Sequence, residues 1–284
     1  MDTAKIAEPI SGDKLYQQRA RAAVPILVRQ ALAHGPIYYS DLALELGMPN
    51  PRNLNYVLGS IDQTLVDLSK EWDEEIPPIQ CLVINKNTGL PGEGIGWFIT
   101  TEKEHFQRLS RKQQRSFVDV ELHKIYSYQR WFEVLEVLSL QPNTENFNQL
   151  LSGTRKYQGG GESQEHLDLK MYIKDHPEIF SLPKKIIGET EYPLPSGDLV
   201  DVLFKNGYHW TGIEVKSEIS NSYDIIRGLF QCIKYHVVIE AYQSVQQTPQ
   251  NARTILALGK SLPRELIPIK NILGIEVIEN IKPE

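Results

Sequence analysis

Two carboxylates and a lysine lie close together in the C-terminal half of the sequence. Asp201 is followed thirteen residues later by Glu214, and Lys216 comes two residues after that. Because side chains alternate along a strand with a period of two, Glu214 and Lys216 would emerge on the same strand face. Mg²⁺ takes oxygen ligands and is often held by one or two carboxylates together with several waters. The spacing therefore predicts a metal site with a cation beside it, which is what hydrolysis of a phosphodiester requires.

A succession of strands and helices is expected to position these residues. The segments LVDVLFKNG and HWTGIEVKSE read as neighbouring strands, and the turn sequence Pro195–Asp198 joins the first of them to a preceding strand. The predicted elements are a helix at 164–174, strands at 185–194, 199–207 and 209–218, a helix at 222–242, a strand at 251–260, a short helix at 263–273 and a strand at 275–280. This α-β-β-β-α-β-α-β order predicts a fold of the α+β or α/β class with a central mixed sheet.

The order and the residues on it resemble the PD-(D/E)XK nuclease superfamily. The resemblance is closest to the branch with a Gln-x-x-x-Tyr motif, which includes RecB-type nucleases. It is carried by SGDLVDVLF, GIEVKSE and GLFQCIKYHV, with GESQEHLDLKMYI ahead of them, and it covers about residues 161–279. It implies that the C-terminal part forms a restriction-endonuclease-like core with an αβββαβ mixed sheet.

The same resemblance implies a set of catalytic residues, namely Asp201, Glu214, Lys216 and Glu165. Asp201 and Glu214 would share one cation, Mg²⁺ or alternatively Mn²⁺, with Glu165 and the Val215 carbonyl as further ligands. Bound metal lowers the pKa of a coordinated water and polarises a phosphate. Lys216 would orient that water and neutralise the charge of the transition state.

Three residues of the predicted helix 222–242 are expected to contact substrate. Gln231 and Tyr235 are four residues apart and therefore share one helix face. The resemblance implies that they contact substrate or the catalytic lysine. Arg227 lies one turn earlier and is a candidate phosphate contact.

Other interpretations of these residues stay open at this point. Glu214–Lys216 would also fit the exposed face of an edge strand. Asp198 is better explained as a turn residue, and Glu162 as a partner of the helix dipole. His166 and Asp168 are candidates to join the site, but the exposed polar face of the helix that begins near Gln164 is the preferred interpretation.

Composition limits the class of protein. The chain has 284 residues, 41% hydrophobic and 23% charged, which favours two globular domains. It has no apolar run long enough to span a membrane and no apolar segment near its N-terminus that resembles a signal peptide. Cys81 and Cys232 cannot form a disulfide framework and read as small hydrophobes. The expected location is the cytoplasm. The net charge of −6 argues against a protein that coats nucleic acid non-specifically.

The N-terminal part predicts a helical domain with a β-ribbon. Helical patterns cover residues 13–32, a segment that begins at Ser40 as N-cap and ends at Gly47, and residues 51–72. Two extended runs then flank a hairpin signal at residues 87–89. Three helices and a ribbon describe a winged helix. Residues 18–100 also resemble alkylguanine-DNA alkyltransferase-like domains, without their Pro-Cys-His-Arg motif, which implies a DNA-binding scaffold without alkyl transfer.

Residues 101–140 form a helical pattern with basic residues and aromatics interleaved. The basic side chains could face nucleic acid, but a solvated helix with its aromatics in the core is the preferred interpretation. Three glycines at 159–161 mark a joint. The predicted domains are therefore a winged-helix-like domain at 1–100, a helical connector at 101–158 and a nuclease domain at 159–284.

The resulting functional hypothesis is a cytoplasmic, Mg²⁺-dependent deoxyribonuclease, which the resemblance associates with prokaryotic defence, restriction or repair. DNA is the expected partner, and no membrane is involved. The acidic charge suggests action that depends on a regulatory protein partner or on assembly, and symmetric cutting of a duplex would need a homo-oligomer. The alternatives are a catalytically silent DNA-binding regulator or adaptor, and a nuclease directed at RNA.

Overall fold

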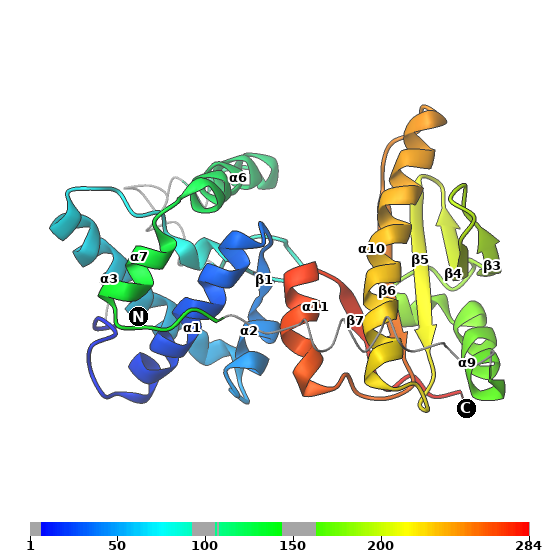
Figure 1. Ribbon diagram of the computed structural model, residues 1–284. Helices are drawn as coiled ribbons and strands as arrows, with labels where there is room; N and C mark the ends of the chain where they lie inside the picture. The colour runs from blue at the N-terminus through cyan, green and yellow to red at the C-terminus, as the bar shows by residue number, and fades with distance from the viewer. Residues whose placement is uncertain (1–6, 93–105, 107, 144–162, 284) are drawn as a thin grey trace. The chain divides into compact units, whose positions relative to one another are not determined.

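The protein is described by a computed structural model. The described residues are 7–92, 106, 108–143 and 163–283. The chain contains two compact units, Met1–Glu145 and Asn146–Glu284. Helices dominate the first unit, and a five-stranded mixed sheet dominates the second (Figure 1). The glycines at 159–161, where the sequence predicted a joint, lie outside the described residues.

The first unit is built on helices packed around one hydrophobic core. Its elements are α1 (Leu15–Leu32), β1 (Ile37–Tyr38), α2 (Tyr39–Glu45), the 3₁₀ helix η2 (Pro51–Asn53), α3 (Leu54–Trp72), the 3₁₀ helix η3 (Ile79–Leu82), β2 (Val83–Ile84), α6 (Arg111–Ser127) and α7 (Trp131–Val137). The predicted helices at 13–32 and 51–72 are confirmed to within a few residues. One detail is wrong, because α2 starts at Tyr39, so Ser40 lies in its first turn instead of capping it.

The predicted β-ribbon is only partly extended. The segment before the turn folds as the 3₁₀ helix η3, because Pro77 and Pro78 restrict the backbone and remove two amide donors. The short strand β2 pairs in parallel with β1. A turn closes beyond it, where the Asn85 amide donates to the Leu90 carbonyl at 2.8 Å. The second run of the predicted hairpin begins at Leu90, and Pro91 forms an antiparallel bridge with Ile84. The rest of that run, residues 93–99, lies outside the described residues.

Helices α6 and α7 belong to the same core as α1 and α3. Trp131 is buried in that core and donates its indole N–H to the Ile125 carbonyl at 2.9 Å. The basic residues that follow the pattern pair with acidic neighbours: Arg115 with Asp119, Lys124 with Glu121 and Glu75, and Arg130 with Glu133 and Glu74. These contacts fit the preferred interpretation of a solvated helix with aromatics in the core.

The second unit follows the predicted order of helices and strands. Its elements are α9 (Gln164–Asp175), the 3₁₀ helix η5 (Pro177–Phe180), β3 (Glu189–Pro193), β4 (Leu199–Asn206), β5 (His209–Lys216), α10 (Ser222–Val245), β6 (Ala252–Leu258), the 3₁₀ helix η6 (Arg264–Leu266), α11 (Ile267–Leu273) and β7 (Glu276–Ile278). The main difference is that β3 is shorter than expected, since residues 185–188 precede it without joining the sheet.

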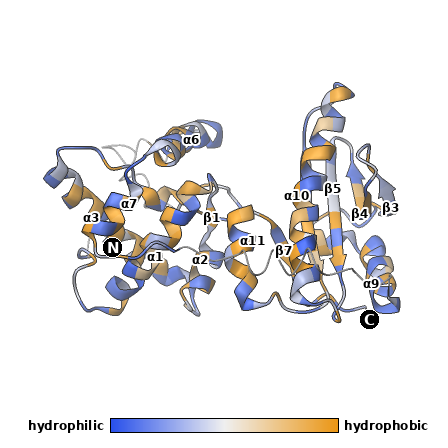
Figure 2. Ribbon diagram, viewed as in Figure 1, coloured by the Kyte–Doolittle hydropathy of each residue, from blue (hydrophilic) through white to orange (hydrophobic). Residues whose placement is uncertain are grey.

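The sheet of this unit has the strand order β3-β4-β5-β6-β7. The pairs β3–β4 and β4–β5 are antiparallel, and β5–β6 and β6–β7 are parallel. Alternation along the strands sends Val215 and Ala257 to the core beneath α9, and Leu256 and Leu258 to the core beneath α10. The two helices therefore cover opposite faces, and hydrophobic and hydrophilic residues alternate along α10 as expected for a helix packed on one side (Figure 2).

Both cysteines, Cys81 and Cys232, are buried and unbridged, and burial raises the pKa of each thiol. Among the described residues no helix has the length and apolar character needed to cross a bilayer.

Candidate functional site

The site lies where β4 separates from β5. The last ladder pair between the two strands joins Val202 to Ile213. At the next position Asp201 uses its side chain instead, because its Oδ2 accepts a hydrogen bond from the Val215 amide at 2.8 Å. A carboxylate thus takes the place of a backbone carbonyl at the mouth of this fork. The local break in pairing leaves room for the side chains of Asp201 and Glu214 to approach each other.

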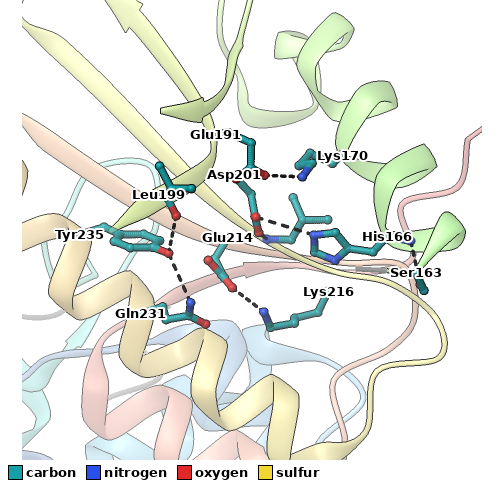
Figure 3. A network of polar contacts seen from close by, with 11 residues as sticks. Ser163, His166, Lys170, Glu191, Leu199, Asp201, Glu214, Lys216, Gln231 and Tyr235 are labelled. Carbon is teal, nitrogen blue, oxygen red and sulfur yellow. Dashed lines mark hydrogen bonds and ion pairs between the residues drawn. The ribbon is translucent and has the colours of Figure 1, made fainter. Parts of the chain in front are cut away.

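Glu214 and Lys216 leave β5 on the face that α10 covers. Their side chains form an ion pair between Lys216 Nζ and Glu214 Oε1 (Figure 3). Gly228 of α10 lies directly over them, since a Cβ atom at this position would be 2.7 Å from Leu256 Cδ1, 3.2 Å from Lys216 Cε and 3.4 Å from Glu214 Cγ. The absence of a side chain at Gly228 is what lets the helix approach the pair so closely.

Glu214 is the most unusual ionisable group of the site. Its side chain is 3% exposed, and burial together with the negative charge of Asp201 raises its pKa to about 7, against the opposing effects of Lys216 and Tyr235. Its Oε2 atom is buried and makes no hydrogen bond of ordinary geometry among the described residues, although the Tyr235 hydroxyl lies near enough to lower the pKa of the carboxyl. A buried carboxylate oxygen without a partner is costly, so this atom is suited to a ligand that supplies positive charge.

Lys216 remains a cation in this environment. Desolvation by itself would lower the pKa of Lys216, but the carboxylate of Glu214, helped by Asp201 and Asp224, outweighs it and raises that pKa. A lysine that stays protonated contributes positive charge and hydrogen-bond donors. It does not act as a base.

Tyr235 and Gln231 reach the site from α10, as Figure 3 shows. Tyr235 is buried and donates its hydroxyl to the Leu199 carbonyl at 2.9 Å, and Gln231 Nε2 donates to that hydroxyl at 3.3 Å. Burial and the charges of Glu214 and Asp201 raise the pKa of Tyr235. The pair thus fastens α10 to the start of β4, and Arg227, one turn earlier, is exposed.

Helix α9 brings His166 close to Asp201, although the exposed helix face was the preferred prediction for this residue. Glu165 lies exposed in the first turn of α9, where the Ser163 hydroxyl caps the helix by accepting from the His166 amide at 3.2 Å. His166 Nε2 lies 3.7 Å from Asp201 Oδ1. The helical period contained this signal, because positions 166, 169 and 173 share one face and Leu169 and Ile173 are buried.

Lys170 and Glu191 were not singled out by the sequence. Lys170 of α9 is only 2% exposed and forms an ion pair with Glu191 of β3, beside Asp201 in Figure 3. Asp198 keeps its predicted place in a turn. Its pKa is lowered by hydrogen bonds from Lys234, at 2.7 Å, and from Ser196.

The donor set fits a hard divalent cation. Asp201 and Glu214 supply two carboxylates from neighbouring strands. Mg²⁺ commonly takes one or two carboxylate ligands from a protein. The unpartnered Glu214 Oε2 is the observation that favours such an ion. The described residues contain no cluster of three or more His, Cys, Asp or Glu side chains placed to hold a metal. Remaining positions would therefore fall to waters, substrate oxygens or a backbone carbonyl such as that of Val215.

Comparisons with models of known protein families, with curated proteins and with solved structures found no match for this chain.

Proposed function

We propose that the second unit is a metal-dependent nuclease that hydrolyses DNA phosphodiester bonds. The observation that carries this proposal is the convergence of Asp201, Glu214 and Lys216 at one strand fork, with the buried Glu214 Oε2 lacking a partner. Phosphodiester hydrolysis needs negative ligands for a cation and a positive group near the phosphate. The fork provides both within one small region.

Each residue has a role that follows from its surroundings. Asp201 and Glu214 would hold Mg²⁺ or Mn²⁺, with the Val215 carbonyl as a further ligand. A bound ion of this kind supplies charge neutralisation at the phosphate and a coordinated water of lowered pKa. Lys216, kept protonated by its carboxylate neighbours, would donate hydrogen bonds to a phosphate oxygen or to the attacking water and so offset developing negative charge.

The surrounding elements support the same proposal. The order α9-β3-β4-β5-α10-β6 with a mixed sheet is the order expected of a PD-(D/E)XK core. Gln231 and Tyr235 both border the site, as that resemblance implies, and the exposed Arg227 is available to a phosphate. The first unit would bind DNA or a partner protein through its helices, as a winged-helix-like module would.

A direct cleavage assay tests the proposal. Plasmid DNA, linear DNA and labelled RNA are incubated with the protein in Mg²⁺, in Mn²⁺ and in EDTA. We expect metal-dependent DNA cleavage, and a loss of about 10²- to 10³-fold in Lys216→Ala and Asp201→Ala with circular dichroism unchanged. Lys184→Ala is the matched control, because Lys184 is 82% exposed and contacts only Glu178 among the ion pairs of the described residues. Unchanged cleavage by both site variants would refute the proposal. Cleavage of RNA alone would change the substrate class from DNA to RNA.

A second candidate function is a silent DNA-binding regulator or adaptor. The ion pair between Glu214 and Lys216 favours it, since Lys216 already neutralises one oxygen of the carboxylate that a metal would need. Calorimetric titration separates the two functions. Binding of Mn²⁺ that disappears in Asp201→Asn supports the nuclease, and DNA binding without any metal binding supports the adaptor.

A further inference from the structure

The ladder between β3 and β4 is interrupted opposite Asp201. Thr190 pairs with Val202 and Tyr192 pairs with Val200, so the register places Glu191 across from Asp201. Glu191, however, has a φ of 52°, which lies in the left-handed region that residues other than glycine rarely adopt within a strand. The neighbouring strand therefore changes its backbone conformation at the one position that faces the candidate metal ligand.

A buried lysine accompanies this unusual backbone. Lys170 is 2% exposed, and its ammonium group forms an ion pair with the Glu191 carboxylate. A charge so deeply buried requires a partner of opposite sign. Strained backbone conformations persist when their surroundings hold them, and they gather at functional sites. The ion pair supplies such a constraint, because it ties the Glu191 side chain to helix α9.

We propose that Lys170 and Glu191 form a positioning pair for Asp201. By fixing β3 in its interrupted conformation, the pair keeps Asp201 at the fork, where its Oδ2 accepts from the Val215 amide at 2.8 Å. His166, from the same helix as Lys170, lies against the other oxygen of Asp201 at 3.7 Å. The consequence for metal binding depends on the proposed function, whereas the consequence for the bond between Val215 and Asp201 does not.

The test uses Lys170→Met, which removes the buried charge while keeping an unbranched chain, and Glu191→Gln, which keeps the shape of the partner. Lys184→Met is the matched control, because Lys184 lies in the same unit, is 82% exposed and pairs at 3.7 Å with Glu178, away from the β3–β4 ladder. Amide hydrogen exchange by NMR follows Val215 and, for reference, Ile255 and Ala257 of β6. Calorimetry follows binding of Mn²⁺ to the full chain.

The expected result is faster exchange of the Val215 amide in Lys170→Met and Glu191→Gln, with the β6 amides unchanged, and Mn²⁺ affinity weakened by about 10- to 100-fold. The double variant should lose no more than either single variant, because both remove the same interaction. If Lys170→Met does not fold, Glu191→Gln decides the question alone.

Two results would overturn the proposal: an unchanged Val215 amide in both variants, or equal acceleration across the whole sheet, which would mark the pair as merely stabilising. Failure of the proposed function gives a different pattern. The wild-type chain would then bind no Mn²⁺ and cut no DNA, while the Val215 amide still responded to the loss of Lys170 or Glu191, and the positioning role would stand.

Discussion

Two buried ion pairs, one in each unit, use their carboxylates differently. In the first unit Arg29 donates to both oxygens of Glu45, at 2.7 Å and 3.0 Å, and the two side chains are 8% and 6% exposed. In the second unit Lys216 donates to Oε1 of Glu214, and Oε2 makes no hydrogen bond of ordinary geometry among the described residues. The first carboxylate is saturated and fastens α1 to α2. The second has one acceptor atom, Glu214 Oε2, that remains available to a ligand. This favours a role in ligand binding over one in stability.

The largest expected effect comes from breaking the saturated pair. Arg29→Met would leave the Glu45 carboxylate buried without its partner and should lower the free energy of unfolding by about 3–5 kcal/mol. Native-state hydrogen exchange of the α1 and α2 amides measures this loss within the first unit. Replacing both residues, as Arg29→Met with Glu45→Leu, should recover most of it, because no charge then stays buried alone.

Arg52→Met is the control for this prediction, since Arg52 is exposed and a surface substitution should change stability by no more than about 0.5 kcal/mol. If Arg29→Met were as mild as Arg52→Met, the Arg29–Glu45 pair would not be a structural clamp. The Glu45 carboxylate could then no longer serve as the structural example with which the Glu214 carboxylate is compared.

The pH dependence of stability should separate the pairs next. Folding raises the pKa of Glu214 from 4.5 to about 7, so the native state holds this proton more tightly than the unfolded chain. Stability from this group is fully present below about pH 4.5 and is lost as the pH rises to about 7, by up to about 3 kcal/mol. The difference between wild type and Glu214→Gln, measured by urea unfolding across this range, should follow that curve.

The exposed Glu218 provides the comparison variant, and the surface substitution Glu218→Gln should change stability by no more than about 0.5 kcal/mol. A constant difference between wild type and Glu214→Gln would show that the pKa of Glu214 does not move on folding. Glu214 Oε2 would then have to be stabilised by a group that compensates for its burial.

Binding of a metal ion should release the proton that Glu214 holds in the native state. A metal needs the deprotonated carboxylate, so Mn²⁺ affinity should fall by about tenfold for each pH unit below about 7, as Glu214 takes up its proton. Calorimetry in two buffers of different ionisation enthalpy measures the proton released on binding. Release of no proton at about pH 6 would mean that Glu214 is not the group that binds.

Local patterns in the sequence were sufficient to predict the order of elements in the second unit and the shared strand face of Glu214 and Lys216. Those features follow from short-range periodicity, which a single sequence carries. The ion pair between Lys170 and Glu191 could not be predicted in this way. It depends on the register of β3 against β4 and on a left-handed residue within a strand, and neither leaves a local signature. His166 was within reach, because it shares a helix face with two buried apolar residues.

The first unit was predicted less completely, for a different reason. Its helices α1 and α3 have long amphipathic patterns, and the sequence located both. The segment before residue 85 has the β-branched and apolar residues of a strand, but two consecutive prolines direct part of it into the 3₁₀ helix η3. Glu121 of α6 also departs from what its charge predicts. A charged residue in a basic helix is expected to be exposed, but Glu121 is only 7% exposed.

The smallest expected effect concerns Tyr235, for which two interpretations compete. The resemblance implies a substrate contact, whereas the structure shows its buried hydroxyl donating to the Leu199 carbonyl at 2.9 Å. If that bond is its main role, Tyr235→Phe should lower the free energy of unfolding by about 1 kcal/mol and leave the KM for DNA unchanged. Tyr208→Phe, at a residue that is 57% exposed, should change neither quantity. A raised KM at unchanged stability would instead place the hydroxyl against the substrate, and the saturated hydrogen bond would then be the resting state of a group that exchanges partners.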